Sequence, residues 1–175
     1  MIKKLTLISM AIAATVSFAS ADPSNDKCPV SGKAVDKSIT SKNVVVLGAC
    51  CDKCSAKLEK DPDSYKKAIA EATGKAVNSK CPFTGKAIDA EKTVTHEGQT
   101  VALCCGKCVK KAEADPAAMI AKVKADAPGN DKCPVSGKAL DPDVVVRIEQ
   151  EIGFCCGKCK TKFDKDPAAV LKKAS

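Results

Sequence analysis

Cysteine is the residue type in this sequence that could do the most chemistry. The chain has 12 cysteines in 175 residues, against a single histidine. A Cys-Pro pair is followed, after a stretch of nearly constant length, by a Cys-Cys-x-x-Cys run, and this arrangement occurs three times. The three groups are Cys28, Cys50, Cys51 and Cys54; Cys81, Cys104, Cys105 and Cys108; and Cys133, Cys155, Cys156 and Cys159. Thiolates bind soft metals, form disulfides or exchange electrons with other dithiols.

Four cysteines, one on a turn and three at a strand-to-helix junction, are typical of a tetrahedral four-cysteine metal site. Zn²⁺ is the first metal we expect and Cu(I) the second, because both accept thiolate ligands. The pattern leaves open whether the second cysteine of each adjacent pair is a ligand. The hydroxyls of Ser31, Thr84 and Ser136 could donate hydrogen bonds to a thiolate. His96 has no counterpart in the other groups, and we assign it to a loop surface.

Two other interpretations of the same thiols remain open. In the first, Cys28 forms a disulfide with Cys50 or Cys51, whereas strain disfavours a bond between the adjacent cysteines themselves. In the second, the Cys-x-x-Cys runs are redox dithiols at helix N-termini. The βαβ context and the surrounding aromatic residues of a thioredoxin-type dithiol are absent from the sequence.

The cysteine pattern belongs to a longer internal repeat. Each first cysteine opens a Cys-Pro-x-Ser/Thr-Gly-Lys-Ala motif, and these cysteines recur at nearly equal intervals, at positions 28, 81 and 133. An Asp-Pro pair follows each Cys-Cys-x-x-Cys run. We therefore expect a signal peptide at 1–21, repeat 1 at 25–74, repeat 2 at 78–127 and repeat 3 at 130–175.

The same elements are expected in each repeat. Stretches rich in β-branched residues, at 44–47, at 100–103 and at 144–148 with 152–154, predict a short hairpin that delivers the cysteine pair. A helix should begin at that pair, and the Asp-Pro pairs at 61–62, 115–116 and 166–167 should cap a second helix. Gly74 and the run 127–129 should end the first two of these second helices. The aliphatic positions of these helices are assigned to the core.

The glycine after each Cys-Pro turn should take a positive φ. The fold class expected is a small α+β repeat, stapled by metal or disulfide. Aromatic residues make up only 3% of the chain and tryptophan is absent, so a large apolar core is excluded.

The N-terminus predicts export. Residues 1–21 combine Lys3 and Lys4, an apolar run and an Ala-Ser-Ala end, which is typical of a signal peptide cleaved near Ala21. We therefore expect a periplasmic or secreted protein without a stable membrane anchor.

The charge and composition argue against two functional classes. The formal net charge is +8, or +6 without the two signal-peptide lysines, and Arg147 is the only arginine. Interleaved charges and scarce aromatic residues argue against nucleic-acid binding. One histidine excludes three equivalent His-based catalytic sites, and we expect no enzymatic activity. The sequence does not indicate which protein partner, if any, the chain binds.

Repeat 3 resembles the YHS and TRASH family of small cysteine-rich metal-binding modules. The resemblance rests on the Phe-Cys-Cys-Gly-Lys-Cys run at 154–159, Phe163 and the Asp-Pro pair at 166–167. Cys155 and Cys159 correspond to the family's paired cysteines, as do Cys104 with Cys108 and Cys50 with Cys54 in the other copies, whereas Cys156, Cys105 and Cys51 stand where the family often has serine. Ser136 stands where the family has a cysteine, and Cys133 lies three residues earlier.

The resemblance implies a treble-clef-like unit that handles a metal and does not catalyse. We therefore expect an exported protein with three four-cysteine units that buffers, stores or delivers a soft metal. The alternatives are a disulfide-stapled interaction protein and a thiol–disulfide oxidoreductase.

Overall fold

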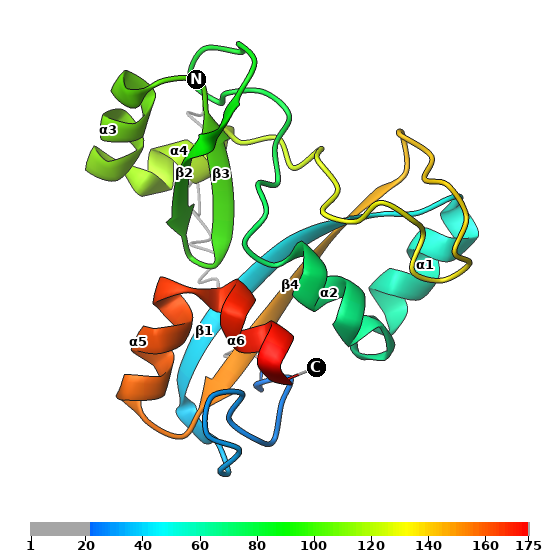
Figure 1. Cartoon of the computed structure of the whole chain (residues 1–175), viewed down its shortest axis with the longest axis vertical. Helices are drawn as coiled ribbons and strands as arrows, with labels where there is room; N and C mark the ends of the chain where they lie inside the picture. The colour runs from blue at the N-terminus through cyan, green and yellow to red at the C-terminus, as the bar shows by residue number, and fades with distance from the viewer. Residues whose placement is uncertain (1–21, 175) are drawn as a thin grey trace, which may run out of the picture.

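The computed structural model describes residues 22–174, so the signal peptide expected at 1–21 lies outside the described residues. Within this part the chain forms a small α+β fold with one four-stranded sheet (Figure 1). The strands are β1 (Asp36–Gly48), β2 (Asp89–His96), β3 (Gln99–Leu103) and β4 (Val145–Phe154). The helices are α1 (Asp52–Lys60), the 3₁₀ helix η1 (Pro62–Tyr65), α2 (Lys66–Ala72), α3 (Gly106–Ala114), α4 (Pro116–Lys122), α5 (Gly157–Lys165) and α6 (Pro167–Ala174).

The sheet joins all three repeats, in the order β2-β3-β1-β4. Strands β2 and β3 form an antiparallel hairpin within repeat 2. Strand β1 of repeat 1 and strand β4 of repeat 3 pair antiparallel from Thr40↔Gly153 to Gly48↔Val145. A short parallel contact, Val44↔Gln99, connects the hairpin to this long ladder. In Figure 1 the ladder crosses the molecule, with α1 and α2 towards one end and α5 towards the other.

The expected short hairpin is present in repeat 2 and wrong for repeats 1 and 3. Repeat 2 turns at Glu97-Gly98, where both residues have positive φ, 48° and 73°. The equivalent positions, seven and six residues before the Cys-Cys pair, are Asn43-Val44 in repeat 1 and Ile148-Glu149 in repeat 3. A β-branched residue resists positive φ and favours extended backbone. These two strands therefore continue straight through and pair with each other instead of folding back.

The helix starts follow the sequence expectation. Cys51, Cys105 and Cys156 are the N-cap residues of α1, α3 and α5. The aspartate of each Asp-Pro pair caps the next helix, because its side chain accepts a hydrogen bond from the backbone N–H three residues later. These bonds are Asp61–Ser64 at 3.4 Å, Asp115–Ala118 at 2.9 Å and Asp166–Ala169 at 2.9 Å.

The ends of the second helices agree with the expectation only in part. Helix α2 ends at Ala72, two residues before Gly74, which has a φ of +79°. Helix α4 ends at Lys122, well before the run 127–129 that was expected to end it. The following chain is extended, because Ala127 N–H donates to Val77 O and Gly129 N–H to Val46 O.

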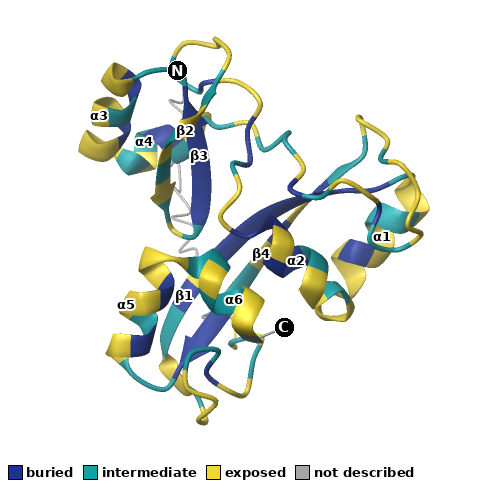
Figure 2. Ribbon diagram, in the orientation of Figure 1, coloured by how far each residue is buried: buried dark blue, intermediate teal, exposed yellow. Residues whose placement is uncertain are grey.

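The apolar residues form three small cores. Figure 2 shows in dark blue the buried positions, which include much of β1, β3 and β4. The first core combines Leu58 and Ile69 of repeat 1 with Val146 and Ile148 of repeat 3. The second lies within repeat 2 apart from Val46 and Val77, with Val145 packed against it. The third places Cys28 of repeat 1 among residues of repeat 3. The structure therefore does not show three self-contained tandem units, because repeats 1 and 3 share their cores.

The third core has the one aromatic pair found among the described residues. Phe154 and Phe163 have ring centroids 5.2 Å apart, and both side chains are buried. Burial of one such side chain stabilises the fold by about 1.5–3 kcal/mol. Because each core is small, a few such side chains supply most of its stabilisation. Across residues 22–174, the helices are too short or too polar to span a bilayer.

Candidate metal centres

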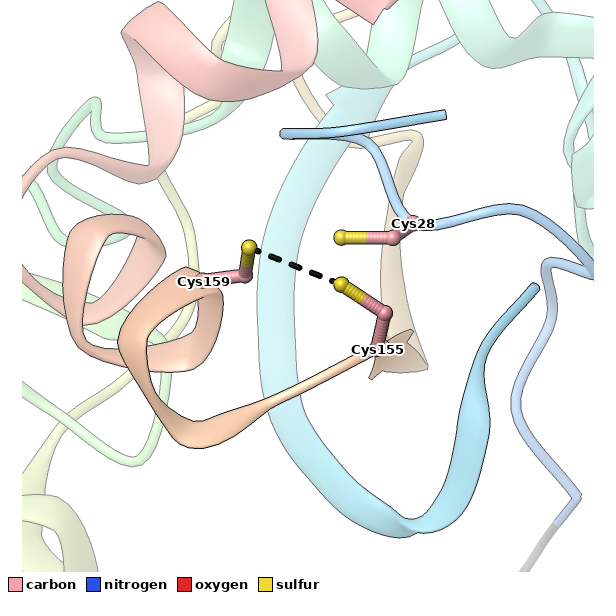
Figure 3. A group of neighbouring side chains, drawn as sticks. All are labelled: Cys28, Cys155 and Cys159. Atoms are coloured by element: carbon pink, nitrogen blue, oxygen red, sulfur yellow. Dashed lines mark hydrogen bonds between the residues drawn. The ribbon is translucent and has the colours of Figure 1, made fainter. Parts of the chain in front are cut away.

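The structure brings the cysteines together in three groups. Cys28, Cys155 and Cys159 have Sγ atoms within 4.8 Å of one another (Figure 3). Cys156 completes this group, with its Sγ atom 3.9 Å from that of Cys155 and 3.7 Å from that of Cys159. In Figure 3 Cys28 approaches from the N-terminal loop, whereas the other two come from the strand end and helix of repeat 3.

The second group also combines repeats 1 and 3: it contains the Cys-Cys-x-x-Cys run of repeat 1 and the first cysteine of repeat 3. Cys50, Cys51 and Cys54 lie within 4.8 Å of one another, with Cys50 Sγ 3.6 Å from Cys54 Sγ and 3.9 Å from Cys51 Sγ. Cys133 of repeat 3 is 1% exposed and packs in the core that Cys50 and Cys54 border. Its thiol contacts that of Cys54, and the contact helps to raise the Cys54 pKa.

The third group lies within repeat 2. Cys81, Cys104 and Cys108 are within 4.8 Å of one another. Cys104 Sγ is 3.7 Å from Cys108 Sγ and 3.8 Å from Cys105 Sγ. This group has the composition that the sequence predicted for every repeat.

The expectation that each repeat holds its own four cysteines is therefore met in repeat 2 alone. Cys28 lies with the Cys-Cys-x-x-Cys run of repeat 3, and Cys133 lies with that of repeat 1. Repeats 1 and 3 thus exchange their first cysteines. This exchange follows from the strands, because β1 and β4 each continue past the point where repeat 2 turns back. Each strand therefore delivers its cysteine pair to the opposite end of the ladder.

The Cys-Pro turn has the same geometry in all three groups. Cys28 N–H donates to Lys33 O at 2.7 Å, and Gly32 N–H donates to Cys28 O at 2.8 Å. Repeats 2 and 3 reproduce both bonds. The φ angles of Gly32, Gly85 and Gly137 are 71°, 68° and 71°, as expected. Glycine is favoured at these positions because a residue with a side chain adopts a positive φ only at a cost in free energy.

In each group a hydroxyl lies beside the first thiol of the Cys-Cys pair, as the sequence predicted. Ser31 Oγ lies 3.1 Å from Cys155 Sγ, and Thr84 Oγ1 lies 3.2 Å from Cys104 Sγ. Ser136 Oγ lies 3.2 Å from Cys50 Sγ. Hydrogen bonds from outside the ligand set orient thiolates and stabilise their charge.

Three asparagines, which were not predicted from the sequence, position the cysteine turns. Each lies three residues before the first cysteine and bonds both backbone groups of the residue two positions before a Cys-Cys pair. The bonds are Asn25 with Gly153 (2.7 and 3.0 Å), Asn78 with Ala102 (2.9 and 2.8 Å) and Asn130 with Gly48 (2.7 and 3.0 Å). The recurrence of asparagine at one repeat position was the available signal.

The hydrogen bonds give the thiols of each group unequal acidities. Burial raises the pKa of the first cysteine, but bonds from the nearby hydroxyl and backbone amides outweigh it and lower the pKa to about 6. This holds for Cys28, Cys81 and Cys133. Burial, together with the neighbouring thiols, raises the pKa of Cys54, Cys108 and Cys159 to about 12.

The N-cap cysteines are also acidic. Backbone N–H groups of the first helical turn, with the adjacent thiols, lower the pKa of Cys51, Cys105 and Cys156. Cys51 is exposed, whereas Cys105 and Cys156 are half-buried. Each group therefore holds negative charge readily at two of its four positions, which favours a cation at its centre.

No disulfide is formed among the described cysteines, all twelve of which are free. The separations of 3.6–3.9 Å given above far exceed a sulfur–sulfur bond of about 2.05 Å. His96 is the last residue of β2, so its assignment to a loop was wrong, and it is not part of the three groups.

Comparisons with known proteins leave the functional assignment to this geometry. No protein-family model matches the chain, and no curated protein or solved structure matches it. The three groups of cysteines could each hold a metal ion, and thiolate sulfur is the ligand that they offer.

Proposed function

We propose that the protein binds three soft metal ions, one in each four-cysteine group, and that it buffers, stores or delivers them outside the cytoplasm. The first metal we propose is Zn²⁺ and the second Cu(I). The ligands are all twelve cysteines, including the N-cap cysteines Cys51, Cys105 and Cys156. A relationship to the YHS and TRASH modules, a treble-clef-like three-repeat origin and the absence of catalysis are parts of the same proposal.

The spacing of the sulfur atoms supports this function most directly. A tetrahedral site with Zn–S bonds of about 2.3 Å has sulfur–sulfur edges of about 3.8 Å. The contacts within the groups measure 3.6 Å for Cys50–Cys54, 3.7 Å for Cys104–Cys108 and 3.9 Å for Cys155–Cys156. Thiols at these separations need little rearrangement to surround one ion.

The surroundings of each group add support. A hydroxyl and several backbone N–H groups face the sulfurs, so the negative charge of a thiolate site is partly offset by fixed donors. Four thiolates with one divalent ion carry a charge of −2, and three such sites would offset the formal +6 of residues 22–175. A lysine-rich surface is therefore suited to the loaded protein.

Cobalt substitution tests this proposal. Reduced protein comprising residues 22–175 is titrated with Co²⁺ under argon, and visible absorption is recorded. We expect the bands of tetrahedral thiolate-bound Co²⁺ to saturate at three equivalents and to disappear on addition of Zn²⁺. Saturation at two equivalents in Cys81→Ser, with the bands otherwise unchanged, identifies the repeat 2 site. Absence of these bands would rule out four-thiolate sites.

Thiol–disulfide exchange is a second candidate, favoured by one observation. Cys51 is exposed with a lowered pKa, whereas the pKa of Cys54 is raised to about 12. Such an unequal pair at a helix N-terminus is typical of redox dithiols. Catalytic reduction of a test disulfide by the dithiol form, lost in Cys51→Ser, would favour this candidate over the metal site.

A further inference from the structure

The two exchanged cysteine groups are connected by one structural unit, unlike the group of repeat 2. Cys28 reaches the group of Cys155 and Cys159 from the other end of the mature chain, and Cys133 reaches Cys50 across the whole of repeat 2. Within repeat 2, by contrast, Cys81 and Cys104 are separated only by their own hairpin. Closing either exchanged group therefore fixes repeat 1 against repeat 3.

The strand ladder makes the exchange reciprocal. Val44 of β1 pairs with Glu149 of β4, the two positions that replace Gly98 of the repeat 2 turn. Pairing continues from there towards Cys50 in one direction and towards Cys155 in the other. Both groups thus lie at the two ends of one ladder and depend on the same register.

The asparagine contacts show the same reciprocity. Asn25 of repeat 1 bonds the backbone of Gly153, and Asn130 of repeat 3 bonds the backbone of Gly48. Asn78 makes the equivalent bonds to Ala102 inside its own repeat. Two turns are therefore docked across repeats and one is docked locally, each by the same side chain.

We propose that the two exchanged groups bind metal as a coupled pair that clips repeat 1 to repeat 3, while the repeat 2 group binds independently. This inference rests on the proposed metal-binding function. A metal in the Cys133 group joins Cys133 to Cys50, so the residues between them no longer count in the chain path from Cys28 to Cys155. The length of that path falls to about a third. Where metal binding and formation of the β1–β4 ladder occur together, the logarithmic dependence of loop closure on length favours the second site about fivefold.

Coupling of this kind must act in both directions. If a metal in one exchanged group raises the affinity of the other, the reverse effect is equal. The fivefold figure includes only the closure of the chain. Ordering of the shared β1–β4 ladder by the first metal adds to it.

Chelator competition on the reduced chain of residues 22–175 tests the coupling. In a Cys81→Ser background two exchanged groups remain, and Zn²⁺ affinity is measured for each by competition with native mass spectrometry. We expect the added Cys28→Ser change to weaken the Cys133 group at least about fivefold, and Cys133→Ser to weaken the Cys28 group equally. The matched control compares Cys81→Ser alone with the unaltered chain. This substitution should leave the Zn²⁺ affinities of both exchanged groups unchanged.

Asn130→Ala and Asn78→Ala provide a second comparison that leaves every thiol in place. Asn130→Ala should lower the Zn²⁺ affinity of both exchanged groups, whereas Asn78→Ala should lower that of the repeat 2 group alone. Equal, independent affinities in all these variants would overturn the coupling while leaving the metal-binding function intact. Failure of the unaltered chain to bind Zn²⁺ would overturn the proposed function and the coupling with it.

Cutting the chain gives a readout that needs no affinity measurement. The side chain of Lys124 is 87% exposed in the last residues of repeat 2, after the end of α4, so a protease site inserted there can be cleaved in the folded protein. With Zn²⁺ bound, fragments 22–124 and 125–175 should co-elute on size exclusion, because both exchanged groups bridge the cut in addition to the β1–β4 ladder. Separate elution of fragments that still retain Zn²⁺ would contradict the exchange.

Discussion

Replacing Gly98 by alanine should destabilise the protein far more than its position in a hairpin turn indicates. Gly98 has a φ of +73°, and an added Cβ would overlap with the carbonyl group of Lys42 and lie 2.9 Å from Asn43 Cα. These are backbone atoms of β1, so no side-chain rotation relieves the overlap. The repeat 2 hairpin must move away from the ladder.

The cost can be worked from three contributions. A left-handed alanine costs about 1–2 kcal/mol, and overpacking against fixed atoms about 1–3 kcal/mol. Movement of the hairpin also removes the 3.1 Å bond from Val44 N–H to Gly98 O, worth about 1 kcal/mol. We expect a total loss of about 3–6 kcal/mol in the free energy of unfolding.

Gly85 is the matched control, because its φ is +68° and a Cβ there would meet nothing within 4 Å. Gly85→Ala should cost only the backbone contribution, about 1–2 kcal/mol. Urea unfolding followed by circular dichroism gives both values under one set of reducing conditions. Equal losses in the two variants would refute the close packing of the hairpin against β1.

Three further predictions concern single residues. Phe163→Ala should lower the free energy of unfolding by about 3–5 kcal/mol, because Phe163 is buried against Phe154, and a loss below about 1 kcal/mol in calorimetry would contradict that core. Asp115→Ala should cost about 1 kcal/mol in urea unfolding through loss of the α4 cap, and an unchanged midpoint would argue against it. Thiolate absorbance of the reduced, metal-free protein should rise near pH 6, because hydrogen bonds outweigh burial and lower the Cys81 pKa to about 6 from 9.0. The stability that this thiol contributes is therefore complete above pH 9 and is lost as the pH falls through 6. Thr84→Ala should shift part of the rise to higher pH, and a single rise near pH 9 would contradict the assignment.

Local features were predictable because each depends on a few neighbouring residues. The Asp-Pro caps, the glycine of the Cys-Pro turn and the hydroxyl contacts to the thiols all lie where the sequence placed them. Their geometry is set by backbone conformation within a few positions. The thiol groups were predicted as four-cysteine clusters for the same reason, and repeat 2 has that composition.

The exchange between repeats 1 and 3 was not predictable from local patterns. It depends on Val44 and Glu149 at positions where repeat 2 has Gly98, and on the pairing of strands far apart in sequence. A β-stretch of given composition can turn back or continue, and the choice is made by turn residues and tertiary contacts. Absence of a turn-forming glycine in two of three otherwise similar repeats was the one available indication.

Metal and thiol content of the exported protein tests the central claim most directly. The chain is expressed with its N-terminal segment, purified after export, and analysed by elemental mass spectrometry together with a free-thiol assay in denaturant. We expect three metal ions per chain and all twelve cysteines free after chelation. Protein without metal and with few free thiols would contradict it and identify a disulfide scaffold instead.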